Sequence, residues 1–220
     1  MRLTVVIPTL NASASLAATL QSLGSFPAEV LVADGGSSDT TAAIATAFGA
    51  RVLKASRGRG PQLQAGTGAS ESPWLLLLHA DTYLSPGWES AVRRHAMDHP
   101  DRAGYFRFAL RSADPHARRL EALVAWRCRF LALPYGDQGL LIARTLLQQV
   151  GGIRPLILME DVDLVRRLGR SRLAPLDATA TTSAERWESG GWYRRSALNL
   201  LCLSLWAAGV PATRLARLYR

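Results

Sequence analysis

Along the first hundred residues, short apolar runs alternate with stretches of helical periodicity. The apolar runs have the length and hydrophobicity of buried strands and lie at residues 3–10, 29–34, 51–55 and 74–81. Leucines recur at helical spacing in residues 16–23, and a second helical stretch at residues 40–49 ends on a glycine. Strands and helices in this order favour a right-handed, mainly parallel sheet flanked by helices. We therefore predict an α/β protein.

The second half of the chain is less regular. Residues 105–110 alternate enough for a strand, with an antiparallel place as one option, and residues 116–133 and 159–170 have helical patterns. Residues 136–144 indicate a turn followed by a short strand. Because no repeat, low-complexity tract or clear linker interrupts the chain, we predict one domain over residues 1–220 with a C-terminal helical appendage.

A glycine-rich segment lies at residues 57–70, RGRGPQLQAGTGAS. Its glycines predict a flexible loop, and Pro61 suits the first turn of a following helix. The loop differs from a Walker phosphate-binding loop because it lacks the lysine and the spacing.

Composition limits the class of protein. The chain has 220 residues, 48% of them hydrophobic, and a formal net charge of +9, with Lys54 as its single lysine. This balance favours anionic partners, but we find no basic face interleaved with aromatic residues, so we expect no nucleic-acid partner. Two cysteines, Cys128 and Cys202, make no disulfide framework, and buried free thiols are the simpler interpretation. Since strand residues follow Met1 directly, we expect no leader and a cytoplasmic protein.

The longest apolar stretch, residues 197–208, is shorter than the roughly 20 residues that cross a bilayer. It predicts a helix buried in the core or in an interface. The tail that follows, residues 212–220, places two leucines among arginines. A surface helix packed by its leucines is the plainer interpretation of this tail. Peripheral contact with the inner face of an anionic membrane, or a homodimer through the C-terminal helices, is the alternative.

Acidic residues follow the apolar runs. Asp34 and Asp81 each end a predicted strand, and Glu160 and Asp161 begin a predicted helix. Open α/β sheets bind ligands beyond the carboxyl ends of their strands. Carboxylates held there can take the polar edge of a nucleotide, a divalent metal and a proton. The pattern indicates an enzyme acting on a nucleotide-activated substrate.

The order of these motifs resembles the family 2 glycosyltransferases with the GT-A fold. The segments VVIPTLNAS, VLVADGGSSDT, LLHADT and MEDVDL carry the resemblance, which covers most of the chain. More narrowly, RGRGPQLQAG, PYGDQGLLIAR and GVPATRLARLYR are similar to a small bacterial subgroup, the radical-SAM/selenium-domain-associated transferases. The resemblance implies a nucleotide-sugar-binding half (residues 1–110), an acceptor and catalytic half (111–190) and C-terminal helices (191–220).

The end of the first predicted strand and the end of the second are the expected base-binding site. By resemblance, Pro8 and Thr9 lie against the nucleotide base. A carboxylate at Asp34 can accept hydrogen bonds from a uracil or guanine N–H or from ribose, and Gly35 leaves room for close approach. A helix-capping acid is the alternative role for Asp34.

The glycine-rich segment supplies candidates for the diphosphate. Arg57 and Arg59 flank Gly58 in what we expect to be an exposed loop, and the planar guanidinium fork suits phosphate. By resemblance, this segment borders the nucleotide and its diphosphate. Gln62 is a further donor-binding candidate.

By resemblance, His79-Ala80-Asp81 occupies the place of the family's Asp-x-Asp motif, which presents carboxylate oxygen to Mn²⁺ or Mg²⁺. The first acid is replaced by His79, so Asp81 is the expected ligand. His79 is a second candidate ligand that favours Mn²⁺, with packing or hydrogen bonding as its alternative role.

The resemblance also assigns the catalytic acids. In inverting members the Asp of a Glu-Asp pair is the general base, which makes Asp161 the base and Glu160 its support. Acids in a first helical turn that only complement the helix dipole are the plainer interpretation.

On the acceptor side, Asp137 and Gln138 lie in a polar turn that precedes the acid pair. Arg186 and Trp187 resemble an Arg-Trp pair near the acceptor and diphosphate in larger relatives. Packing beneath the final helices is the alternative for Trp187.

The implied activity is metal-assisted, inverting transfer from a nucleotide-sugar, with UDP the commonest carrier in the family, to a hydroxyl. The acceptor is expected to be a small molecule or a lipid-linked phosphate, because the chain leaves no room for a separate acceptor domain. The alternatives are a non-catalytic nucleotide-binding relative and a nucleotidyltransferase. The latter usually needs a Gly-rich basic loop after the first strand, which PTLNASAS lacks.

Overall fold

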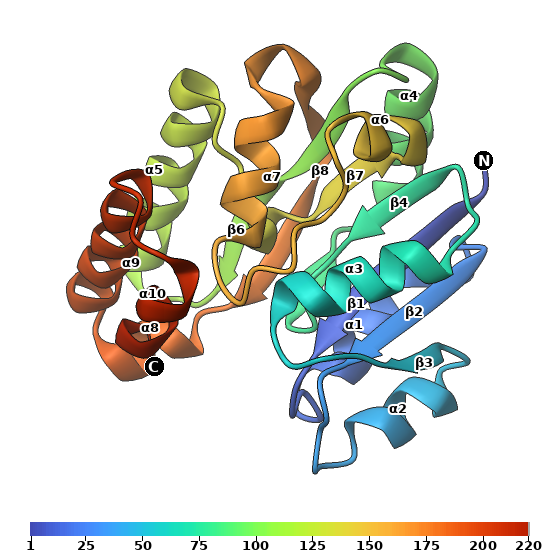
Figure 1. Ribbon diagram of the computed structural model, residues 1–220, viewed down its shortest axis with the longest axis horizontal. Coiled ribbons are helices and arrows are strands. Elements are labelled where there is room, and N and C mark those ends of the chain that lie inside the picture. The colour runs from blue at the N-terminus through green and yellow to red at the C-terminus, as the bar shows by residue number, and fades with distance from the viewer. Residues whose placement is uncertain (220) are drawn as a thin grey trace.

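The computed structural model of the chain describes residues 1–219 and contains one eight-stranded sheet with helices on both faces (Figure 1). The order of the strands in the sheet is β3-β2-β1-β4-β7-β6-β8-β5. Their bounds are β1 (Leu3–Thr9), β2 (Glu29–Asp34), β3 (Arg51–Lys54), β4 (Trp74–Leu77), β5 (Thr82–Leu84), β6 (Ala103–Arg111), β7 (Leu140–Ala143) and β8 (Leu173–Ser183).

The helices connect these strands and cover the sheet. The α-helices are α1 (Leu16–Leu23), α2 (Thr41–Ala47), α3 (Arg59–Ala69), α4 (Trp88–Asp98), α5 (Pro115–Leu131), α6 (Arg144–Gln149), α7 (Glu160–Leu168), α8 (Glu185–Gly190), α9 (Trp192–Ala207) and α10 (Ala212–Leu218). Two 3₁₀ turns are η1 (Gly136–Gln138) and η2 (Arg170–Arg172).

The first half of the sheet is parallel, as predicted. β1 pairs with β2 and β4, and β2 pairs with β3, all in parallel. On β1, Val5 and Ile7 belong to the core cluster that includes α1 and α4, whereas Val6 packs with α3 and α7 in the cluster on the other face. A strand covered on both faces needs no polar alternation, which explains the continuous apolar run.

The second half of the sheet contains antiparallel pairs. β7 runs antiparallel to β4 and to β6, while β6 runs parallel to β8. The sequence interpretation missed β5, α6 and β8. The buried positions of β8 after Leu176 are Ala178, Ala180 and Thr182, so its alternation carries little apolar signal. β4 ends at Leu77, and the predicted metal ligands therefore lie in the connection from β4 to β5.

The glycine-rich segment at residues 57–70 is largely helical, which corrects the prediction of a flexible loop. α3 begins at Arg59, and its glycines allow close packing. A Cβ on Gly60 would collide with the backbone of Leu156, and one on Gly66 would collide with the side chain of Val6. The glycines thus bring α3 tightly onto β1 and onto the segment that precedes α7.

The C-terminal helices α8, α9 and α10 gather at one end of the molecule beside α5 (Figure 1). Cys202 is the one buried residue of α9, and Leu200 and Leu201 are 64% and 51% exposed, so α9 is not buried in the core. Its burial in an interface stays a prediction. Cys128 and Cys202 are buried free thiols, as predicted. Arg220 of the predicted basic tail lies outside the described residues. Among residues 1–219, no helix has the length and apolarity to cross a bilayer.

Candidate active site

The ends of β1 and β2 are joined through the carboxylate of Asp34. Its Oδ1 accepts a hydrogen bond from Thr9 Oγ1 (3.1 Å), and its Oδ2 accepts from the backbone N–H groups of Gly36 (3.1 Å) and Ser37 (2.9 Å). Burial raises the pKa of Asp34, but the hydrogen bonds from Ser37 and Thr9 outweigh it, and the pKa lies below its usual value. Asp34 is therefore an ionised group at the strand ends.

Gln62 fixes α3 to these strand ends. Its amide nitrogen donates to the carbonyl oxygens of Thr9 and Ala33, the latter at 2.8 Å, and the residue is 3% exposed. A Cβ on Gly35 would lie 3.1 Å from that nitrogen, so the glycine admits the glutamine side chain. The observed contacts of Gln62 are thus with the two strands that carry the predicted base-binding residues.

The sequence predicted an exposed loop at Arg59, but the structure places this residue in the first turn of α3. Its Nε lies 2.9 Å from Oε1 of Glu160, whose side chain is 1% exposed. Burial raises the pKa of Glu160 to about 7, and Arg59 offsets part of this effect. Arg57 is exposed, whereas the Arg59 side chain is 31% exposed. The buried Glu160 is therefore tied to the glycine-rich segment.

His79 lies between β4 and β5, next to Arg59. Its Nε2 is 3.4 Å from Arg59 Nη1, which can only donate, so Nε2 is placed as an acceptor. Burial and then the charge of Arg59 lower the pKa of His79 to about 4. The imidazole is consequently neutral near pH 7, with a lone pair on Nε2.

Asp81 is the nearest predicted metal ligand to His79 along the chain. The hydroxyls of Thr182 and Thr82 lie 3.3 and 3.4 Å from its Oδ1, and no hydrogen bond from residues 1–219 reaches Oδ2. Over the same residues, no group of three or more His, Cys, Asp and Glu side chains is arranged around a metal position. The residues that could bind a divalent cation are thus one carboxylate with an open oxygen and one neutral imidazole. A cation held by them would need further ligands from a substrate or water.

Asp161 lies where α7, η1 and the end of β4 meet. Its Oδ2 accepts a hydrogen bond from Gly136 N (2.8 Å), and its Oδ1 accepts from Val162 N (2.8 Å). A Cβ on Gly136 would lie only 2.7 Å from His79 Nε2 and 3.1 Å from Asp161 Oδ2. Burial raises the pKa of Asp161, but Arg59 and the Gly136 N–H outweigh it, so the pKa is lowered and the group is ionised at neutral pH.

Met159, directly before the acid pair, has a left-handed backbone with φ of 67°. Such a conformation is uncommon for a residue with a side chain and persists where the surroundings fix it. It sets the start of α7, and no sequence signal indicated it.

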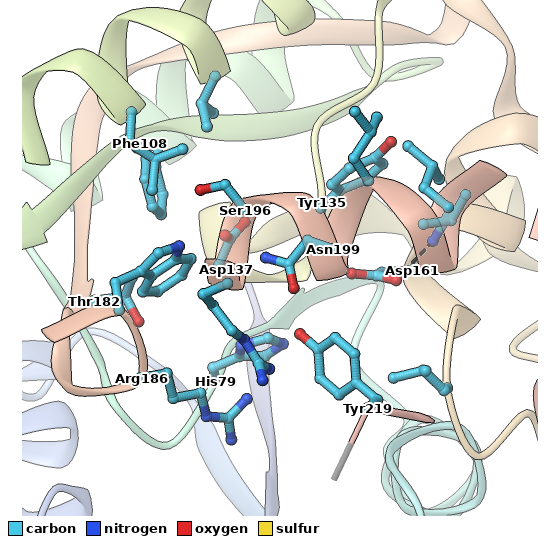
Figure 2. Close-up of a pocket in the computed structure, with 18 of the residues that line it drawn as sticks. His79, Phe108, Tyr135, Asp137, Asp161, Thr182, Arg186, Ser196, Asn199 and Tyr219 are labelled. Atoms are coloured by element: carbon cyan, nitrogen blue, oxygen red, sulfur yellow. Dashed lines mark hydrogen bonds between the residues drawn. The ribbon is translucent and has the colours of Figure 1, made fainter. Parts of the chain in front are cut away.

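A cavity of about 280 Å³ opens between the acids Asp81, Asp137 and Asp161 and the C-terminal helices (Figure 2). Seven predicted site residues line it, and they come from five separate places in the chain: Arg59, His79, Asp81, Asp137, Asp161, Arg186 and Trp187. The remaining predicted residues do not line it: Pro8, Thr9, Asp34, Gly35, Arg57, Gln62, Gln138 and Glu160. Gln138 is 2% exposed and donates to the carbonyl oxygen of Phe106 (3.0 Å), so it fixes η1 to β6.

The structure adds residues that the sequence interpretation missed. Tyr135, Asn199 and Tyr219 point toward the same opening as Asp161 and His79 in Figure 2. Arg127 stacks over the ring of Tyr135, 3.9 Å from its centroid, and Arg195 lies 4.2 Å from the centroid of Tyr219. A lone amide inside the apolar stretch 197–208 was the one available signal for Asn199.

Several buried polar atoms of this cavity have no hydrogen-bond partner among residues 1–219. They are Tyr135 Oη, Asp137 Oδ1, Trp187 Nε1 and Asn199 Oδ1. The pKa of Asp137 is raised to about 6. Burial is the largest cause, the charge of Arg127 opposes it, and the charge of Asp161 adds to it. Buried polar groups are normally paired, so a cluster of unpaired ones is typical of a site that receives a polar ligand.

Solved structures of similar fold include complexes with UDP and with UDP-GlcNAc. Glucosyl-3-phosphoglycerate synthase from Mycobacterium tuberculosis, in complex with Mn²⁺, UDP and glucosyl-3-phosphoglycerate, is 21% identical with a TM-score of 0.56, over 83% of this chain and 70% of that one. TarS 1–349 from S. aureus in complex with UDP-GlcNAc is 15% identical with a TM-score of 0.66, over 100% and 70% of the chains. No protein of curated function matches the chain in sequence.

The sequence profile of the family described as Glycosyl transferase family 2 matches residues 4–151, which contain the strand ends, Arg59, His79, Asp81 and Asp137. The match covers more than half of the 220 residues. The fold is that of the predicted α/β glycosyltransferases. The chain therefore belongs to glycosyl transferase family 2.

Proposed function

We propose that this glycosyltransferase moves a sugar from a UDP-type nucleotide-sugar to an acceptor hydroxyl with inversion at the anomeric carbon. One observation carries the proposal: the Asp161 carboxylate lines the cavity in ionised form, held by the Gly136 N–H beside His79. The UDP and UDP-GlcNAc complexes of proteins with this fold support the donor class.

The donor would bind across the strand ends. Pro8, Thr9, Asp34 and Gly35 would face the nucleotide base and ribose, with the ionised Asp34 accepting a base N–H. Arg57 would meet the diphosphate from the surface. Gln62 supports this site through the backbone of β1 and β2.

A divalent cation would be held by Asp81 and His79. The open oxygen of Asp81 would be the first ligand, and neutral His79 would add its Nε2 lone pair once Arg59, whose Nη1 lies 3.4 Å from that nitrogen, turns away. An imidazole ligand suits Mn²⁺ better than Mg²⁺, which prefers oxygen alone. When bound, the cation supplies positive charge that stabilises the departing nucleoside diphosphate.

Asp161 would act as the general base. Its ionised carboxylate takes the proton of the acceptor hydroxyl while that oxygen forms a bond to the anomeric carbon. The bond from the anomeric carbon to the diphosphate oxygen breaks on the opposite side, and its electron pair leaves with the diphosphate. Glu160 supports the base by holding Arg59, whose charge keeps Asp161 ionised.

The acceptor would occupy the cavity beyond Asp161. The unpartnered atoms of Asp137, Trp187 and Asn199 offer hydrogen bonds to hydroxyls, and Arg127, Arg186 and Arg195 offer positive charge. This lining fits a small molecule or lipid-linked acceptor that bears both hydroxyls and an anionic group. Gln138 contributes by fixing the turn that carries Asp137.

On this proposal residues 1–110 bind the donor, residues 111–190 supply the acceptor side and the base, and the C-terminal helices cover the cavity. The predicted homodimer, the cytoplasmic location and the radical-SAM/selenium-associated subgroup stay predictions.

The test is calorimetric titration of UDP and GDP, with and without Mn²⁺, on the wild type, Asp81→Ala and Asp161→Asn. We expect metal-dependent binding of UDP that Asp81→Ala loses and Asp161→Asn keeps. Donor turnover should fall roughly 10²–10⁴-fold in Asp161→Asn. Loss of UDP binding in Asp161→Asn, or unchanged turnover, would contradict the assignment of the base.

A second candidate is a nucleotide-binding relative without catalysis, because His79 replaces the first acid of the metal motif. Wild-type protein that binds UDP with Mn²⁺ but turns over no UDP-sugar would favour it. Membership of a glycosyltransferase family counts against nucleotidyl transfer.

A further inference from the structure

The cavity is bordered on one side by an exposed apolar stripe on α5. Leu123, Trp126 and Phe130 are 64%, 54% and 52% exposed. Arg127 of the same helix lines the cavity, and Leu123 and Phe130 lie four residues before and three residues after it. Since such residues are surface neighbours on a helix, the stripe runs along the edge of the cavity wall.

α9 forms another wall of the same cavity and is also apolar outside. Leu200 lines the cavity and is yet 64% exposed, so the cavity opens along this edge of the helix. Leu201 is 51% exposed, and the other exposed positions between Ala197 and Ala208 are occupied by alanine and serine. Five of the exposed apolar residues of the two helices are here called the rim: Leu123, Trp126, Phe130, Leu200 and Leu201.

The surroundings of the rim are positively charged. Arg119 and Arg129 on α5 and Arg194 on α9 are exposed, and residues 189–219 contain no Asp or Glu. Glu121, the single acid of α5, is paired with Arg118 at 2.7 Å. The rim therefore combines exposed aliphatic and aromatic groups with three exposed arginines, against two exposed acids on the neighbouring α8, Glu185 and Glu188.

We propose that the rim docks on an anionic lipid bilayer, with the mouth of the cavity at the lipid surface. Exposed aromatic and leucine side chains can enter the boundary between headgroups and acyl chains, while arginines attract anionic headgroups. A second copy of the chain fits this surface less well, because a twofold contact would bring the same arginines together. The rim thus selects a lipid-linked acceptor over a freely soluble one, a consequence that rests on the proposed function.

The experiment is vesicle co-sedimentation of the full chain, which needs no activity and so fails or succeeds independently of the proposed reaction. Vesicles of phosphatidylcholine alone are compared with vesicles containing about 30% phosphatidylglycerol. We expect binding to the anionic vesicles only, weakened by salt. Trp126→Ala/Phe130→Ala should lower the partition coefficient roughly tenfold. Arg119→Gln/Arg194→Gln should lower it by a similar factor.

The matched control is Phe48→Ala, which removes an aromatic group that is 49% exposed beside α2, at the opposite end of the molecule from α5 and α9 (Figure 1). It should leave vesicle binding unchanged. Circular dichroism melts identify any variant that fails to fold, and the arginine pair then gives a second, surface-only test. No binding to anionic vesicles, or an equal loss in Phe48→Ala, overturns the proposal. A concentration-dependent dimer that the rim variants abolish assigns the surface to a second copy instead.

Discussion

Arg59 Nε lies 2.9 Å from Glu160 Oε1, and this ion pair joins the first turn of α3 to the first turn of α7. The Arg59 side chain is 31% exposed and can be solvated by water, whereas the Glu160 side chain is 1% exposed. The charge of Glu160 therefore depends on its partner far more than the charge of Arg59 does. Arg59 also faces His79 and lowers the pKa of Asp161. One arginine of the glycine-rich segment thus contributes to the lowered pKa of the proposed base and, after burial, to that of a proposed metal ligand.

Removing Arg59 takes away the partner of the buried Glu160 carboxylate. At about pH 8, where Glu160 of the wild type is mostly ionised, Arg59→Gln is expected to lower the free energy of unfolding by about 1–3 kcal/mol, measured by urea denaturation. Arg59→Gln/Glu160→Gln should recover at least half of the loss, because no unpaired charge remains. The exposed pair Arg51 and Glu29 is the control, where either single change should cost about 0–1 kcal/mol. A double variant as unstable as Arg59→Gln would contradict the coupling.

The stability of the protein should depend on pH through Glu160. Burial raises its pKa in the folded protein to about 7, against 4.5 for an ordinary glutamate. The folded protein therefore holds a proton that the unfolded chain has released, and the free energy of unfolding falls as pH rises from about 4.5 to about 7. Glu160→Gln should flatten this fall between pH 5 and pH 7 in urea titrations. The surface change Glu71→Gln separates the effect from net charge, and an unaltered slope in Glu160→Gln would count against it.

Gly136 should tolerate no side chain. A Cβ there would lie 2.7 Å from His79 Nε2, so Gly136→Ala must displace the imidazole or η1. We expect donor turnover to fall roughly a hundredfold, because the base and the metal ligand shift together. Gly68→Ala on α3 is the control, since nothing lies within 4 Å of its Cβ position. Wild-type turnover in Gly136→Ala would mean that this close approach is not needed for catalysis.

We expect Asn199 to lower the free energy of unfolding, because its side chain keeps a hydrogen-bonding group in the cavity for a ligand. Its Oδ1 is buried without a partner among residues 1–219, so Asn199→Leu is expected to raise the free energy of unfolding by about 1 kcal/mol. UDP affinity should stay within about twofold, because the proposed donor site lies at the strand ends. Ala197→Leu adds a leucine to the exposed side of α9 and controls for helix propensity. A destabilised Asn199→Leu would instead indicate a structural hydrogen bond.

The parallel half of the sheet was predictable because its strands are buried on both faces. Val5, Val6 and Ile7 form one uninterrupted apolar run, and Asp34 follows another. β8 was not predictable, since Ala178, Ala180 and Thr182 have little hydrophobic signal and the strand forms by pairing with β6 on one side and β5 on the other. The glycines of α3 indicated a loop because glycine favours flexible backbone, but in the structure they lie in a helix that packs closely on Val6 and Leu156.

By itself, the sequence determined the class of fold and the family, and it named seven of the residues that line the cavity, because motif order and apolar periodicity are local properties. Only the tertiary structure decided what each group faces. It paired Arg59 with Glu160 and placed Gly136 between His79 and Asp161. It also brought Asn199 to the cavity that His79 and Asp161 line, although these residues are far apart in the sequence. Charge states and contacts of this kind depend on burial and on neighbours distant in sequence, which no local pattern records.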